Sequence, residues 1–197
     1  MKKNDSKRVI IILIVYALIL GCIASGTLAY LNWENSDDQR TIVEFTLRKD
    51  FSCFATVSGS IEPSNVLLAP TTCTNSTHAI KRQIDLTAEL YGELDVYMDL
   101  WLEINSIDSE LAATSNFKYA LTTNANSCTT GVVTSGTFNG LSAGDTIDFF
   151  VQRQYTQTTT DIYYLYVWLD AAETSTNVMN KTFRLSINGM CENSELE

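Results

Sequence analysis

Apolar and polar side chains alternate along much of this chain. The clearest run covers residues 94–104, in which every even-numbered residue is apolar. Residues 84–90 repeat the pattern, and Gly92-Glu93 separates the two runs. A period of two places successive side chains on opposite faces of a strand, so both runs are predicted strands with their even-numbered residues in a core. The short separation predicts that they form a hairpin.

Further strands are predicted wherever short apolar, aromatic or β-branched runs lie between polar connections. One stretch, residues 106–113, has a helical pattern in which Ser106 is a candidate cap. This stretch is long enough for only a turn or two, and no other helical pattern lies between the strands, so βαβ units are excluded. The predicted fold is all-β, an antiparallel β-sandwich of jelly-roll type. The further strands are residues 42–48, 51–57, 117–121, 146–152, 162–169 and 183–187, the last ending at Asn188-Gly189.

The N-terminal region differs from the rest of the chain. Residues 1–8 are basic, and residues 9–24 are apolar without a charge. This order is typical of an export signal or a membrane-anchor helix whose N-terminus stays in the cytoplasm. We therefore predict a signal peptide or membrane anchor over residues 1–31, a linker over 32–41 and an ectodomain over 42–197. The ectodomain is expected outside the cell or on its surface.

Three fates of the N-terminal segment stay open. Thr27-Leu28-Ala29 offers small residues at the −3 and −1 positions of a cleavage after Ala29. The sixteen residues 9–24 lie between a signal core and a full span of about 20 residues, so a retained anchor is the second fate. Leu20-Gly21-Cys22 fits a loose lipoprotein signal with the lipid on Cys22. A retained or lipidated segment would hold the protein at the membrane.

Charge restricts the partners of the ectodomain. The formal net charge is −10 and the basic N-terminus contributes +3, so the exported part carries −13. Such a surface repels nucleic acid and anionic lipid. We expect no nucleic-acid partner.

Four cysteines lie beyond the N-terminal segment, at Cys53, Cys73, Cys128 and Cys191. An even number in an exported domain favours two disulfides, although four cysteines allow three pairings. Our hypothesis pairs Cys53 with Cys73 and Cys128 with Cys191, and four reduced thiols are the alternative. No spacing of cysteines or histidines fits a zinc site, so no metal is predicted.

Candidate catalytic groups are few. His78 is the single histidine, which excludes most histidine-based catalytic and metal motifs. Asp95, Asp99 and Glu103 share one strand face, but residues four apart on a strand are roughly 13 Å apart. That is too far for a glycosidase pair or for one calcium ion. We predict no catalytic residue, no cofactor and no enzymatic activity.

Aromatic residues on predicted outer faces are the candidate ligand or interface residues. They are Tyr97, Trp101, Tyr164, Tyr166 and Trp168. One interpretation is a flat platform on which sugar rings stack, and a second is a contact between copies of the protein. A third is that loops such as residues 105–116 cover the rings.

Three segments resemble parts of one family, the TasA/camelysin-like exported proteins of Gram-positive bacteria. Residues 25–31 (Ser-Gly-Thr-Leu-Ala-Tyr-Leu) are similar to the end of that family's signal. Residues 141–146 (Leu-Ser-Ala-Gly-Asp-Thr) are similar to a turn entering a sandwich strand, and residues 177–187 to the closing strand. Leu28, Ala143 and the four cysteines depart from the family pattern. The resemblance implies a subunit of surface or biofilm fibres that a dedicated signal peptidase processes.

The predicted function is therefore structural, through self-association or association with other surface proteins. The alternative is a cell-surface carbohydrate-binding or adhesion module that uses an exposed aromatic face. Edge strands offer unpaired backbone groups, and residues 35–47 are the predicted donor strand for assembly.

Overall fold

The computed structural model of the chain describes residues 40–47, 50–62, 68–92, 95–179 and 181–193. The predicted signal or anchor of residues 1–31, with Ala29 and Cys22, lies outside these residues, as does most of the predicted linker. Among the residues described, no helix combines the length and apolarity needed to cross a membrane.

Strands dominate the described residues. They are β1 (Arg40–Leu47), β2 (Phe51–Ser58), β3 (Ala79–Leu90), β4 (Val96–Ile107), β5 (Phe117–Thr122), β6 (Val132–Thr137), β7 (Thr146–Tyr155), β8 (Thr159–Leu169) and β9 (Phe183–Asn193). A four-residue helix, α2 (Ser109–Ala112), and a 3₁₀ turn, η1 (Thr176–Val178), complete the described elements.

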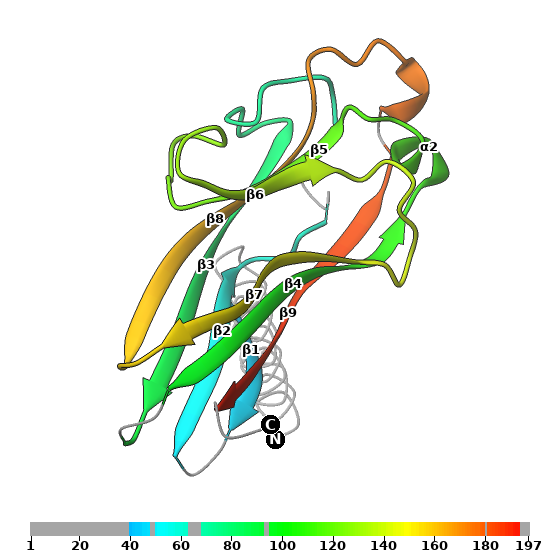
Figure 1. Cartoon of the computed structure of the whole chain (residues 1–197). Coiled ribbons are helices and arrows are strands. Elements are labelled where there is room, and N and C mark those ends of the chain that lie inside the picture. The colour runs from blue at the N-terminus through cyan, green and yellow to red at the C-terminus, as the bar shows by residue number, and fades with distance from the viewer. Residues whose placement is uncertain (1–39, 48–49, 63–67, 93–94, 180, 194–197) are drawn as a thin grey trace, which may run out of the picture. The chain divides into compact units, whose positions relative to one another are not determined.

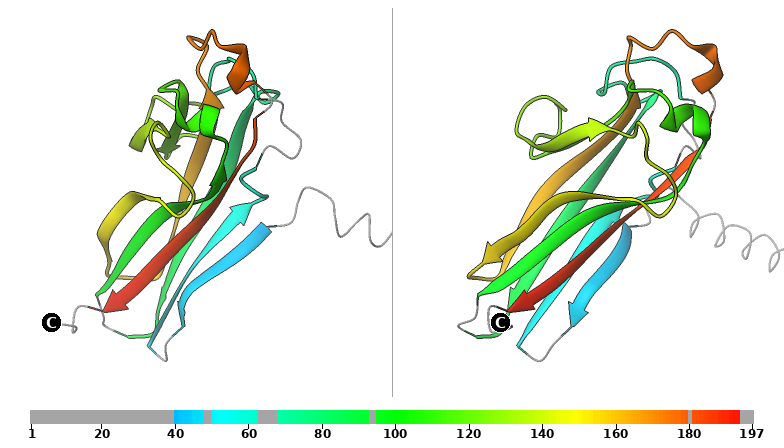
Figure 2. Two further views of the ribbon diagram at one scale, coloured as in Figure 1. Left: turned by 90° about the vertical axis from the view of Figure 1, so that its right-hand side faces the viewer. Right: turned by 45° about the vertical axis from the view of Figure 1, so that its right-hand side comes forward.

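The strands form two antiparallel sheets that pack against each other (Figures 1 and 2). The six-stranded sheet has the order β1-β2-β3-β8-β5-β6, and the three-stranded sheet has the order β7-β4-β9. The predicted all-β antiparallel fold is therefore confirmed.

Alternation of side chains builds the core between the sheets. The apolar residues of β4 (Val96, Met98, Leu100, Leu102 and Ile104) are all 0% exposed. They share one cluster with Ile84, Leu86 and Ala88 of β3, which are equally buried. Burying such an aliphatic side chain contributes roughly 1.5–3 kcal/mol, so this alternating pattern is what fixes the register of both sheets.

The prediction that these two runs form a hairpin is wrong. β3 pairs with β2 and β8, whereas β4 pairs with β7 and β9. The chain between them passes from one sheet to the other. Alternation shows only that each run has one buried face. Two such strands bury these faces equally well whether they pair in one sheet or lie in opposite sheets across the core.

Some boundaries also differ from the predictions. The sequence analysis missed β6, a short edge strand that contains Gly136 and has no alternation. β9 continues through Asn188-Gly189, its predicted end, as far as Asn193. The predicted helix shrinks to α2, which begins after Asp108, while Ser106 still belongs to β4.

The disulfides connect residues that are distant in the sequence. Cys53 of β2 bonds to Cys191 of β9, and Cys73 bonds to Cys128. All four predicted cysteines are thus paired, but our hypothesis for their pairing was wrong. Cys53 and Cys191 lie on strands of opposite sheets, and only the packing of the sheets brings them together.

Candidate functional site

The edge of the six-stranded sheet at β1 carries the main candidate site. β1 pairs antiparallel with β2, from Arg40 opposite Ser58 to Leu47 opposite Ser52, with an irregularity between Glu44 and Thr46. No other described strand pairs with β1, so its second edge leaves backbone groups unpaired by the sheet.

Side chains of β1 contact the core in part. Val43 is half-buried, and Phe45 is half-buried and packs against the main hydrophobic cluster. Ile42 points the other way and is 67% exposed. The alternation predicted for a donor strand is therefore present at these three positions.

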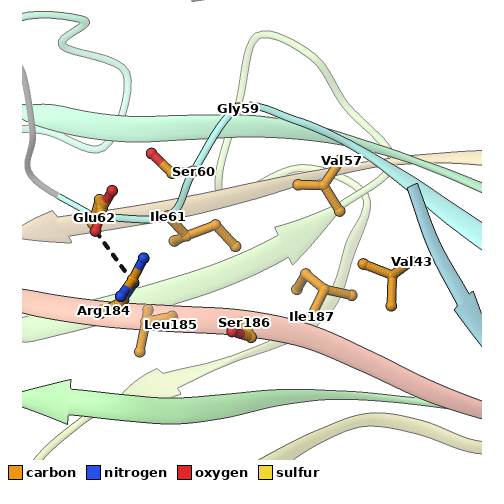
Figure 3. Close-up of a pocket in the computed structure, with 10 residues that line it drawn as sticks. All are labelled: Val43, Val57, Gly59, Ser60, Ile61, Glu62, Arg184, Leu185, Ser186 and Ile187. Carbon is orange, nitrogen blue, oxygen red and sulfur yellow. Dashed lines mark ion pairs between the residues drawn. The ribbon is translucent and has the colours of Figure 1, made fainter. Parts of the chain in front are cut away.

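A groove of about 230 Å³ lies beside β1, between the end of β2 and the middle of β9 (Figure 3). We call it the β2/β9 groove. Its apolar lining comes from Val43, Val57, Ile61, Leu185 and Ile187. Figure 3 shows the Ile61 and Ile187 side chains between the bend after β2 and the strand β9, with Val43 and Val57 beside them.

Polar contacts fix one end of this groove. Ile61 forms an isolated antiparallel bridge with Leu185, whose N–H donates to the Ile61 carbonyl at 3.1 Å. Arg184 forms an ion pair with Glu62, with Nε and Oε2 3.4 Å apart. The segment after β2 and the strand β9 are thus held together near the start of β1. The groove stays open on its solvent side.

The sequence analysis did not find the walls of this groove. Ile61 lies outside every predicted strand, and Arg184 and Glu62 are distant in the sequence. The last predicted strand ended at Asn188-Gly189, whereas Gly189 lies beneath the Phe45 ring inside β9. Only the predicted alternation of β1 pointed to this region.

The five candidate aromatic residues do not form one platform. Tyr97 and Trp101 lie in β4 of the three-stranded sheet, and Tyr164, Tyr166 and Trp168 lie in β8 of the six-stranded sheet. Each set alternates with core residues, so each faces outward from its own sheet. The two sets therefore lie on opposite sides of the sandwich.

A loop covers part of the β8 set. Tyr166 is 1% exposed, and its hydroxyl donates to the carbonyl of Ala125 at 2.6 Å. Trp168 and Cys128 share a small cluster with it, and Cys73–Cys128 ties this loop to the segment before β3. A covering loop was among the open interpretations, but residues 123–131 provide it here, not residues 105–116.

The outer face of the three-stranded sheet carries Tyr97 and Trp101, both half-buried, among polar side chains. Three carboxylates beside them accept hydrogen bonds from side-chain amides. Gln154 donates to Asp95 at 3.0 Å, Gln152 to Glu192 at 3.2 Å and Asn188 to Glu103 at 2.6 Å. This face combines aromatic rings with oriented acceptors.

A polar network closes the sandwich between β7 and β8. The hydroxyls of Tyr155 and Tyr163 both donate to Asp161, at 3.0 and 3.4 Å, and Arg153 pairs with the same carboxylate at 2.8 Å. The Arg153 guanidinium also lies 5.5–5.7 Å from the rings of Phe150, Tyr155 and Tyr163. Burial raises the pKa of Tyr163 to about 12, and it raises the pKa of Tyr155 further.

Histidine, cysteine and carboxylate side chains are dispersed over the part of the chain that the structure describes. There, no three histidine, cysteine, aspartate or glutamate side chains are grouped closely enough to hold a metal ion. His78 is half-buried in the segment before β3, and Asp95, Asp99 and Glu103 are spread along β4.

No protein-family model, curated protein or solved structure matches this chain. The geometry of the β1 edge and of the outer sheet faces is therefore the basis for a functional proposal.

Proposed function

We propose that this protein is an exported bacterial surface or matrix protein that acts structurally, by association through β1. The observation that carries the proposal is the position of β1, an edge strand seated beside an apolar groove with its second edge unpaired. In strand addition, β1 of one copy would pair with β2 of the next, so that main-chain hydrogen bonds hold it and its alternate side chains set the register. Two disulfides favour an oxidising compartment outside the cytoplasm.

The sequence resemblance to TasA/camelysin-like proteins supports the same proposal. Two packed antiparallel sheets are also compatible with the jelly-roll-like sandwich that the sequence predicts. Cleavage after Ala29 would release the segment before Arg40 from the N-terminal helix that the sequence predicts. We further propose that the protein is not an enzyme.

The proposal is tested by comparing two truncated chains, one beginning at Tyr30 and one beginning after Arg48. Light scattering and electron microscopy should show polymers of the first chain and not of the second. Circular dichroism on both chains controls for folding. Equal behaviour, whether both chains remain monomeric or both form fibres, would contradict the role of β1.

A second candidate function is carbohydrate binding on the outer face of the three-stranded sheet. Tyr97 and Trp101 offer ring surfaces for stacking, and the neighbouring amide-bound carboxylates offer acceptors for hydroxyl groups. Titration with glucan and glucosamine oligomers should then change tryptophan fluorescence, and Trp101→Ala should abolish the change. Tyr91→Ala, at an exposed tyrosine outside this face, is the control. A flat titration with every oligomer would exclude this function for these sugars.

A further inference from the structure

We propose that the Cys53–Cys191 disulfide holds β2 and β9 in place while β1 leaves the edge of the sheet, so that β1 of a second copy can pair with β2 instead. This inference rests on the proposed assembly through β1. In this inference the Cys53–Cys191 bond allows β1 to be exchanged between copies while the rest of the sandwich stays folded.

The first observation is which strands the covalent ring encloses. The bond between Cys53 and Cys191 closes a ring over 138 residues of sequence. Strands β3 to β8 lie inside this ring, together with most of β2 and β9. Among the strands that the structure describes, β1 alone lies wholly outside it. β1 can therefore leave without breaking or threading the ring.

The second observation is where the bond lies relative to β1. Cys53 is the cross-strand partner of Thr46 in β1. Cys191 is two residues from Gly189, and Gly189 lies beneath the Phe45 ring. Cys53 is 0% exposed and Cys191 3% exposed. The crosslink thus lies in the core beside the second half of β1. It joins β2 and β9, the two strands next to β1.

The third observation is the position of β1 at the edge of the six-stranded sheet. As an edge strand it shares a hydrogen-bond ladder with β2 alone among the described strands. Of the three β1 side chains whose burial the structure describes, Ile42 is exposed, and Val43 and Phe45 are only half-buried. Elements with few buried contacts open locally, at a lower free energy than global unfolding.

Removal of β1 would take Val43 from the wall of the groove and leave β2 as the new edge of the sheet. Besides the packing of β2 and β9 in the core, the Ile61–Leu185 bridge and the Arg184–Glu62 ion pair connect the two sides at one end. The Cys53–Cys191 disulfide connects β2 to β9 at the other end. The groove then keeps two fixed walls, which is what an incoming strand requires.

The second disulfide provides a matched control. Cys73–Cys128 joins two loops over the outer face of β8 and touches neither β1 nor the groove. Its ring spans 55 residues and excludes both β2 and β9. Its loss removes a crosslink but should leave strand exchange unaffected.

The experiment is hydrogen exchange, followed by mass spectrometry, on the full chain with both disulfides formed. The amides of β1 should exchange faster than those of β2 and β9 by about tenfold or more, a ratio that corresponds to about 1.4 kcal/mol. In the Cys53→Ser/Cys191→Ser variant the three strands should exchange together. The Cys73→Ser/Cys128→Ser variant should behave as the wild type does.

A second measurement uses a labelled synthetic peptide of residues 40–47, added to the full chain. The wild type and the control variant should incorporate it, and the Cys53→Ser/Cys191→Ser variant should not. Equal exchange of β1, β2 and β9 in the wild type would overturn the inference even if the variant fails to fold. Independent opening of β1 together with uptake of the peptide, in a protein that never polymerises, would uphold the inference and contradict only the proposed assembly.

Discussion

The Phe45 ring lies so close to Gly189 that a side chain at position 189 has no room. A Cβ atom there would stand 2.6 Å from Cε2 of the ring and 2.7 Å from the carbonyl oxygen of Asp99. Real Cβ atoms do not approach other atoms this closely, so β1 can pack on β9 only where β9 has a glycine. Phe45 and Gly189 together therefore select the register in which β1 enters.

Gly189→Ala is expected to lower the free energy of unfolding by about 1–3 kcal/mol, because the added methyl group overpacks the site. Urea denaturation measures this change. Gly92→Ala is the control, since a Cβ at Gly92 meets nothing within 4 Å.

The double variant Phe45→Ala/Gly189→Ala tests whether the ring is the cause. Removing the ring relieves one of the two close contacts, so the cost of Gly189→Ala should shrink in this background without disappearing. If the changes in unfolding free energy of the two substitutions simply add, Phe45 and Gly189 do not interact.

Loss of the Cys73–Cys128 bond is expected to uncover the β8 aromatics while the sandwich stays intact. In the Cys73→Ser/Cys128→Ser variant, acrylamide should quench tryptophan fluorescence more strongly, because Trp168 is 9% exposed only while the loop is tied down. The free energy of unfolding should fall by roughly 2–4 kcal/mol. Unchanged quenching would mean that the loop covers Trp168 without the crosslink.

Alkaline pH is expected to weaken the β7–β8 network. The folded state holds the pKa of Tyr163 at about 12, above the value of about 10 in the unfolded chain, so neutral tyrosine favours folding. This contribution is complete below pH of about 10 and is lost as pH rises towards about 12. Denaturant midpoints across this window should fall more for the wild type than for Tyr163→Phe. Parallel curves for the two proteins would contradict this assignment.

Much of the fold could be predicted from local pattern. Strict alternation in residues 94–104 identified the central strand of the three-stranded sheet and its buried face, because a period of two has one simple structural meaning. The same reasoning failed for β6, where Gly136 and exposed valines leave no pattern.

Pairing between distant segments could not be predicted in this way. Whether β3 pairs with β4 or packs across from it depends on the whole topology, and the partner of Cys53 depends on which strands face each other. The same applies to the candidate site. The alternation of β1 was visible in the sequence, whereas the slot at Gly189 and the bridge between Ile61 and Leu185 exist only after folding.

Crosslinking in trans tests the association through β1 most directly. Ile42 and Thr56 are cross-strand partners, one on β1 and the other on β2, and both side chains reach the surface. Two variants of the chain beginning at Tyr30 would be mixed, one with Ile42→Cys and the other with Thr56→Cys. In the control, a variant with Ile162→Cys takes the place of the Thr56→Cys variant. The account predicts a disulfide-linked dimer for the in-register pair and none above background for the control, because β1 of one copy lies on β2 of the next. Linkage that is absent from the in-register pair, or equally abundant with the control, would contradict it.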